Sequence, residues 1–161
     1  MKPWCARLPA TAFFLALWLN IFWCEGAAAR TVAIDDTGTQ ALQPTVAMRW
    51  KSAAPSRGAG GNLMTGAMVV RLHLNLGPWL HHAGRIYLVL PAQAPGPMKL
   101  SWTTQGRLLP GQVIAGNRTL VYAGPVTSRV LEDTLTLQFT VDGRLMGHGV
   151  PVDIHFEIDE E

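Results

Sequence analysis

The sequence TLTLQFTVDGRLMGHGVPVDIHFEID, residues 134–159, decides the fold class of this chain. Its first run alternates polar and apolar residues, and its last run places five apolar residues at every second position: Val150, Val152, Ile154, Phe156 and Ile158. Successive side chains of a β-strand leave opposite faces of the sheet, so a period of two predicts a strand buried on one face. The stretch therefore predicts two antiparallel strands, with the turn residues Asp142 and Gly143 between them.

Short apolar segments separated by Gly and Pro make up the rest of the chain. The segment 85–90 is apolar on both faces, as a central strand covered on each side would be. Prolines interrupt most windows in which a helix could start, and the best candidate for a helical turn is Ser128–Asp133. Further strands are expected at residues 31–34, 45–50, 68–76, 98–103, 111–114 and 118–123.

Many short strands with turn residues between them are typical of a sandwich or barrel. We therefore predict an all-β protein, an immunoglobulin-like antiparallel β-sandwich with a single domain over residues 30–161. A Gly/Pro/Ser-rich segment at residues 52–62 is expected to be a flexible loop.

The first 29 residues match a secretory signal peptide. Lys2 and Arg7 precede an apolar segment, and small residues follow at 27–29, where cleavage after Ala29 is expected. The apolar run is shorter than the ~20 residues that cross a bilayer, so an uncleaved anchor is the less favoured alternative, as is lipidation of Cys24. The prediction is export to the periplasm or cell surface, with no membrane span after cleavage.

Charge and cysteine content exclude several functions. The net charge of +2 comes from 13 basic and 11 acidic residues, and the basic residues are scattered, which argues against nucleic-acid binding. The only cysteines, Cys5 and Cys24, lie within the leader, so the mature chain has no disulfide or zinc-thiolate site. No cofactor is expected, and the acidic residues 159–161 are expected to form a solvated tail.

The histidines do not form a recognisable metal site. His81 and His82 are adjacent, and neighbours on a strand point to opposite faces, so a solvated turn is the favoured interpretation. His73 and His155 are expected on outward faces of separate strands, where they could be neighbours across a sheet. Without a carboxylate at a ligand spacing, no metal site is predicted.

A catalytic triad can be assembled only on paper, from Ser101 or Ser128, a histidine and Asp133. Triads are recognised by geometry, and the chain lacks the Gly-x-Ser-x-Gly elbow that would position a nucleophile. We therefore predict that the protein is not an enzyme, and an envelope hydrolase is the third-ranked hypothesis.

Four segments of the later half resemble subunits of bacterial chaperone-usher fimbriae, of the class whose pilins lack disulfides. They are Ser101–Gly106, Gly116–Gly124, Leu131–Leu135 and Val152–Asp159. The resemblance implies a sandwich completed by a strand that a neighbouring subunit donates, with chaperone and usher as further partners and possible homo- or hetero-polymers. The donor would be an N-terminal segment, here Thr31–Ile34, which is short for that role.

The leading hypothesis is an exported structural or interaction protein, fimbrial or fimbria-associated, that makes β-strand-mediated contacts. The alternative is a monomeric periplasmic binding or accessory domain with a surface groove near Trp79 and Trp102, although core packing is the default for both indoles. The candidate interaction residues are Val32, Ile34, Trp79, Trp102, Val152, Ile154 and Phe156.

Overall fold

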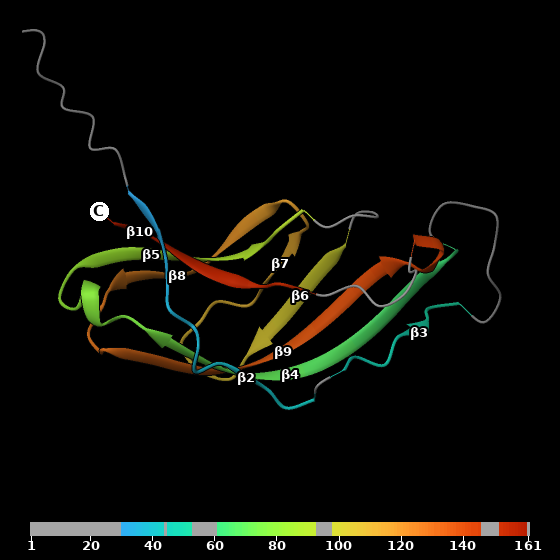
Figure 1. Cartoon of the computed structure of the whole chain (residues 1–161), viewed down its shortest axis with the longest axis horizontal. Helices are drawn as coiled ribbons and strands as arrows, with labels where there is room; N and C mark the ends of the chain where they lie inside the picture. Colours follow the sequence, from blue (N-terminus) through green and yellow to red (C-terminus); the bar gives the residue numbers. More distant parts are fainter. Residues whose placement is uncertain (1–29, 44, 53–60, 93–97, 146–151, 161) are drawn as a thin grey trace, which may run out of the picture.

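The longest alternating runs of the sequence form the two longest strands, β4 (Leu63–Asn75) and β9 (Val130–Asp142), in the computed structural model of this chain (Figure 1). They pair antiparallel along all 13 positions of each strand. The structure describes residues 30–43, 45–52, 61–92, 98–145 and 152–160. The predicted signal peptide and most of the predicted loop at 52–62 lie outside the described residues.

Two antiparallel sheets face each other. The 4-stranded sheet has the order β1 (Thr31–Ala33), β10 (His155–Glu160), β5 (Ala83–Leu90) and β8 (Asn117–Pro125). The 6-stranded sheet has the order β2 (Gln40–Ala41), β4, β9, β6 (Lys99–Thr104) and β7 (Gly111–Ile114), with β3 (Arg49–Trp50) also paired to β4. The 3₁₀ turns η1 (Gly77–Trp79) and η2 (Gly143–Leu145) are the only helical elements in the described residues. The predicted all-β sandwich is confirmed.

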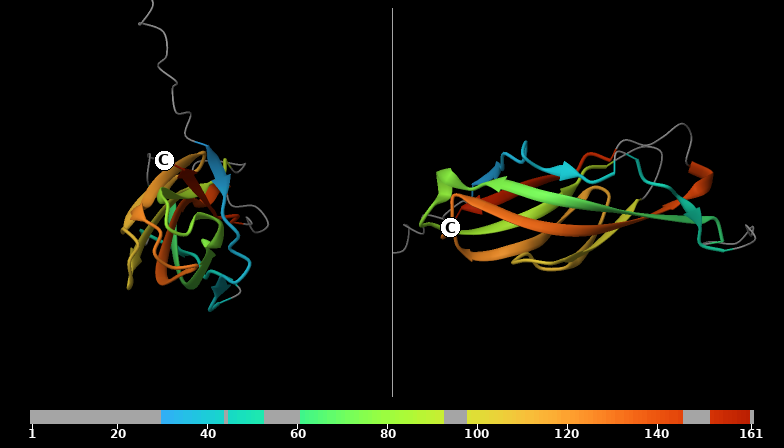
Figure 2. Two further views of the ribbon diagram at one scale, coloured as in Figure 1. Left: turned by 90° about the vertical axis from the view of Figure 1, so that its left-hand side faces the viewer. Right: turned by 90° about the horizontal axis from the view of Figure 1, so that it is seen from below.

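The N-terminal segment passes from one sheet to the other. After β1 pairs with β10, Asp35 forms an isolated bridge with Asn75, and β2 then pairs with β4. Figure 2 shows this segment running down one side of the sandwich. On the other side β7 and β8 adjoin, and the N–H of Leu109 donates to the carbonyl of Val121 at 2.7 Å. Each side of the sandwich is therefore bounded by backbone contacts between the sheets.

The core follows from the alternation of each strand. Leu72 and Leu74 of β4 and Ile86 and Leu88 of β5 are 0% exposed, and they face one another across the space between the sheets. Full burial of one such side chain stabilises a fold by about 1.5–3 kcal/mol. The inward faces of two sheets thus supply the core without any cysteine.

Several boundaries differ from the sequence prediction. Ser128–Asp133 is not a helical turn, because Val130 begins β9 and the buried Leu131 and Asp133 continue its alternation. Of the expected strand at 45–50, only Arg49 and Trp50 are in a strand. The closing strand begins at His155 in the structure, while residues 150 and 151 lie outside the described residues.

The predicted acidic tail is wrong for the two residues that the structure describes. Asp159 and Glu160 belong to β10, and Asp159 is 9% exposed. Asp159 lies opposite Thr31 of β1 and Arg85 of β5, so the strand pairing continues past the last apolar residue, Ile158. The sequence of an acidic run at a chain end does not indicate which cationic side chain it will pair with in the folded state.

Candidate functional site

A cavity of about 240 Å³ lies between the two sheets, beside the residues that lead into β10. Its walls come from β4 and β9 of one sheet and from β5 and β10 of the other. The buried wall residues are all apolar: Val70, Leu72, Leu88, Leu135, Leu137, Phe139 and Phe156. The half-buried or exposed residues, which form its rim, are Asp36, Thr39, Ala41, Met68, Val152 and Ile154. We call this site the apolar groove.

The size of the apolar groove limits what it can hold. A dry cavity of about 150 Å³ accommodates a benzene ring, whereas sites for drug-sized ligands range from about 300 to 1,000 Å³. A volume of about 240 Å³ therefore suits one or two large apolar side chains. Among the described residues, the polar side chains on its rim are those of Asp36 and Thr39.

The edge of β10 beside the apolar groove is only partly paired. β1 covers β10 at Glu157, Ile158 and Asp159, and the N–H of Ile34 donates to the carbonyl of Phe156 at 2.8 Å. After Ile34 the chain leaves for the other sheet. Among the described residues, none makes a backbone hydrogen bond with Val152–Ile154.

This unpaired stretch keeps the register of a strand. Val152, Ile154 and Phe156 all line the groove, so the alternation of β10 continues through the two residues upstream. Backbone groups alternate sides along a strand, which places the N–H and C=O of Ile154 on the same side as the Phe156 carbonyl that Ile34 binds. Backbone groups of Val152–Ile154 that have no backbone partner among the described residues thus lie next to an apolar cavity.

The paired half of β10 is held by a charged cluster on the outer face of the sheet. The guanidinium of Arg118 donates to both carboxylate oxygens of Asp159, at 2.9 and 3.0 Å, and the hydroxyl of Thr31 donates to the same carboxylate at 2.6 Å. Arg118 also lies 4.2 Å from the ring centroid of Tyr87 and 3.5 Å from Glu157. The hydrogen bonds from Arg118, and next that from Thr31, hold the pKa of Asp159 below its usual range, against the opposing effect of burial.

Three of the candidate interaction residues line the apolar groove. Val152, Ile154 and Phe156 lie together there, on the wall contributed by the closing segment. Val32 and Ile34 lie in β1 and just after it, with Ile34 5% exposed and Val32 packed against the core. The structure therefore places these two residues in their own sandwich, next to the groove.

The structure packs Trp79 and Trp102 in the core, which is the default prediction for both indoles, and not on an exposed surface. The two residues are 8% and 3% exposed, so both indoles belong to the core. The indole N–H of Trp79 donates to Glu160 at 2.7 Å, and that of Trp102 donates to the carbonyl of Leu109 at 2.9 Å. Each indole has a hydrogen-bond acceptor inside the fold, as buried tryptophans require.

The histidines are separated by the topology. His73 lies in β4 with its Nδ1 3.1 Å from Glu132, whereas His155 lies in β10 of the other sheet with its Nε2 3.6 Å from Glu157. They are not neighbours across a sheet. His81 and His82 lie in a turn, and His81 has a φ of 70°. Within the described ranges, no group of three or more His, Cys, Asp or Glu residues could hold a metal ion.

Asp133 has a structural role instead of a place in a triad. Its carboxylate is buried and accepts backbone N–H groups from Leu108 at 3.0 Å, Gln105 at 3.2 Å and Thr134 at 2.7 Å. Three amide donors occupy this carboxylate, and no histidine is bonded to it among the described residues.

The rim residues that sequence analysis missed lie on β4, on β2 and on the segment that crosses between the sheets. Met68 continues the inward series of Val70 and Leu72, and this spacing was a usable signal for it. Asp36, Thr39 and Ala41 join the rim only because the chain changes sheets there, which no local pattern encodes.

Comparisons with protein-family models, with curated proteins and with solved structures give no match to this chain. In the part of the chain that the structure describes, no helix has the length and apolar character needed to cross a membrane.

Proposed function

We propose that this protein is a non-enzymatic interaction module, an exported immunoglobulin-like β-sandwich that binds an extended apolar segment of another polypeptide in the apolar groove. The observation that carries the proposal is the stretch Val152–Ile154 beside the cavity, which makes no backbone hydrogen bond to another described residue. In β-strand addition, main-chain hydrogen bonds provide affinity and pockets for alternate side chains provide specificity. The groove offers both within one site.

The incoming strand would lie beside β10, along the part of its edge that the N-terminal segment does not cover after Ile34. Its alternate side chains would enter the cavity between Met68 and Ile154, and its backbone would pair with that of Ile154. Two buried apolar side chains contribute roughly 4 kcal/mol, and two or three backbone hydrogen bonds about 1 kcal/mol each. Ordering a peptide opposes much of this, so a lasting complex needs further contacts outside the groove.

Such short strand contacts suit a fimbrial or fimbria-associated subunit, in which neighbouring subunits are held by many interactions at once. Val32 and Ile34 are already packed in their own sandwich. The occupant in this proposal is therefore a strand of a neighbouring subunit, chaperone or usher, and β1 stays with its own chain.

A peptide spanning residues 30–36 is a suitable probe, because it is a short extended segment with the alternating apolar residues Val32 and Ile34, which pack against the core in the chain itself. We expect it to raise the melting temperature of the purified protein, since a ligand at 100 times its Kd stabilises the folded state by about 2.7 kcal/mol. A control peptide with Asp at the positions of Val32 and Ile34 should have no effect. If neither peptide stabilises the protein and the protein stays monomeric at high concentration, strand addition is wrong.

A matched pair of variants locates the binding. Ile154→Asp places a charge on the rim of the groove and should abolish stabilisation by the peptide. Ile114→Asp makes the same change at a 52% exposed residue of β7 and should leave it intact. Equal loss in both variants would show that the peptide does not use the groove.

A monomeric binding domain is the second candidate, and the volume and apolar walls of the groove support it. Indole, a small apolar probe, would then bind to the monomeric protein, and the peptide of residues 30–36 would not displace it. Ile154→Asp would abolish the binding of indole. Export itself is tested separately by the N-terminal residue of the secreted protein, which we expect to be Arg30.

A further inference from the structure

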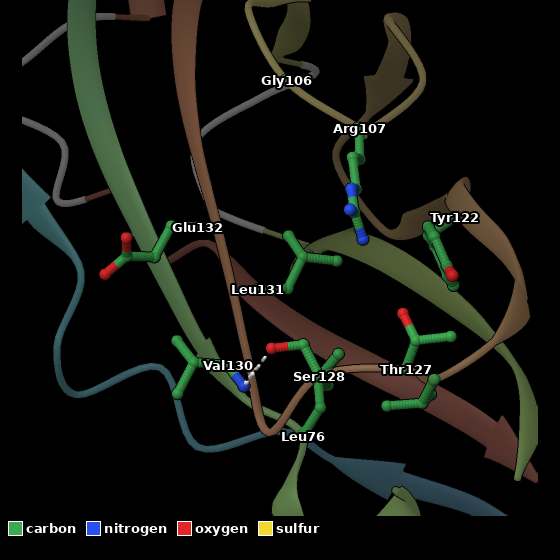
Figure 3. A pocket seen from close by; sticks show the side chains of 10 residues that line it. Leu76, Gly106, Arg107, Tyr122, Thr127, Ser128, Val130, Leu131 and Glu132 are labelled. Carbon is green, nitrogen blue, oxygen red and sulfur yellow. Dashed lines mark hydrogen bonds between the residues drawn. The ribbon is translucent and has the colours of Figure 1, made fainter. Parts of the chain in front are cut away.

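A second pocket, of about 280 Å³, lies at the end of the sandwich where β8 passes into β9 (Figure 3). Its base is apolar, because Leu76, Val126 and Leu131 line it and are 2%, 2% and 8% exposed. The exposed residues Thr127 and Ser128 border it with hydroxyl groups. We call this site the Arg107 pocket, after the guanidinium that extends over its apolar base.

The Arg107 side chain extends from the loop between β6 and β7 toward Leu131 and Tyr122, as Figure 3 shows. No carboxylate of a described residue forms an ion pair with it. Glu132 also borders the pocket, but its side chain projects from the other side of the β9 ribbon and pairs with His73 at 3.1 Å. Among the described residues, the guanidinium of Arg107 therefore has no ion-pair partner, while the carboxylate of Glu132 borders the pocket from the other side of β9.

The loop that carries Arg107 is held on both sides of that residue. The buried carboxylate of Asp133 accepts the N–H of Gln105 at 3.2 Å and that of Leu108 at 3.0 Å. A side chain could not be added at Gly106, because its Cβ would lie 2.8 Å from the Asp133 carboxyl carbon.

The hydroxyl of Thr104 also donates to the carbonyl of Leu108 at 2.8 Å, so the downstream side of the loop has a second anchor. A guanidinium on an anchored backbone loses less conformational freedom when it binds a ligand, which favours binding.

We propose that the Arg107 pocket binds a carboxylate attached to a small apolar group, as at the C-terminus of a polypeptide that ends in an apolar residue. The guanidinium offers two parallel N–H donors that match the two oxygens of a carboxylate. The apolar group packs on Leu76, Val126 and Leu131, and the hydroxyl of Thr127 faces the same space. One unpaired arginine suits a group with one negative charge. This site is independent of the apolar groove.

N-acetyl-leucine and its neutral analogue N-acetyl-leucinamide are matched probes. Titrated into the full-length purified protein and followed by backbone amide NMR shifts, N-acetyl-leucine should perturb residues 106–108 and 126–131, and the amide should bind at least 10-fold more weakly. Equal binding of the two probes would overturn the proposed recognition of a carboxylate.

Variants of the exposed Arg107 test the same site without disturbing the core. Arg107→Gln should weaken binding of N-acetyl-leucine at least 10-fold, and Arg107→Lys should weaken it less, because the charge remains while the paired donors are lost. Arg49→Gln, a change at an exposed arginine of β3, is the control and should leave the affinity unchanged. Unchanged affinity in Arg107→Gln, with an unchanged melting temperature, contradicts the proposal.

Inorganic phosphate separates an amphipathic site from a general anion site. At equal concentration it should displace little N-acetyl-leucine, because it lacks the apolar group that packs on the base of the pocket. Complete displacement by phosphate would overturn the assignment to an apolar carboxylate. Ile154→Asp should not alter binding of N-acetyl-leucine, so this test and that of the apolar groove can fail separately.

Discussion

Two buried carboxylates, Asp133 in β9 and Asp159 in β10, hold two different borders of this sandwich. Asp133 is 6% exposed and accepts backbone amides of the loop that carries Arg107. Asp159 is 9% exposed and binds the guanidinium of Arg118 and the hydroxyl of Thr31. The first positions the border of the Arg107 pocket, and the second fixes β1 beside the apolar groove.

The difference shows two ways in which a folded chain compensates a buried negative charge. Asp133 relies on the dipoles of neighbouring amides, whereas Asp159 relies mainly on a full positive charge from a strand of the same sheet. Hydrogen bonds to the charged form stabilise a carboxylate in both environments. The consequences of mutation differ, because an amide left without an acceptor stays buried while a guanidinium can turn to solvent.

Asp133→Ala should have the largest effect of the changes considered. It removes the acceptor of the buried Leu108 N–H, and we expect a loss of about 3 kcal/mol in the free energy of unfolding. Chemical denaturation measures this loss, with Glu132→Ala as the control at the exposed neighbour. Weaker binding of N-acetyl-leucine should accompany it, and a loss below that of Glu132→Ala would contradict the role assigned to Asp133.

Arg118→Met should lower the free energy of unfolding by about 2 kcal/mol, the next largest effect. The reason is that Thr31 is then the one strong donor left to the Asp159 carboxylate. The apolar stem remains and can still cover Tyr87, so the loss reports on the charge. Hydrogen exchange at Val32 should accelerate as β1 detaches more often, and Arg49→Met serves as the control. Unchanged exchange in Arg118→Met would mean that the ion pair does not hold β1.

Acidification should weaken the Asp159 border in a defined direction. The folded pKa of Asp159 is lowered, first by Arg118 and then by Thr31. Its contribution to stability is therefore present above the unfolded pKa of about 3.9 and is lost as the pH falls through the folded value. Between pH 5 and pH 2, the free energy of unfolding should fall less steeply in Asp159→Asn than in the original protein. Equal slopes would rule out this linkage.

Thr31→Val should have the smallest effect and lower the free energy of unfolding by about 1 kcal/mol, because it removes one hydroxyl donor and keeps the shape of the side chain. Thr136→Val, at an exposed residue of β9, is the matched control. The two variants are compared by their denaturation midpoints. If Thr31→Val destabilises the protein no more than Thr136→Val does, Arg118 alone keeps β1 paired with β10.

Neither carboxylate's role could be predicted from the sequence. The sequence predicts Asp133 at the end of a helical turn and offers it for a triad only on paper, and it predicts Asp159 in a solvated tail. A carboxylate has the same chemical formula wherever it lies, and its role depends on donors that come from remote segments. For Asp133 two of the three donors are on a loop 25 and 28 residues away, and for Asp159 the donors are 41 and 128 residues away.

Three residues of the apolar groove could be grouped from the sequence, although the sequence predicts a surface groove elsewhere, near Trp79 and Trp102. Val152, Ile154 and Phe156 share a face because of their spacing alone, so local alternation was sufficient to group them. Trp79 and Trp102 have no such pattern, and their burial depended on which strands covered them. The opening of the groove depended on the place where the N-terminal segment changes sheets.

Alternation in the amino-acid sequence was enough to establish a β-sandwich and the inward faces of β4, β9 and β10, because the direction of a strand side chain depends only on its parity. Pairing partners, the incomplete cover of β10 and the two buried carboxylates arose in the folded chain. Each of them requires backbone or charged groups from distant segments to meet, and the geometry of that meeting is a property of the whole packed structure.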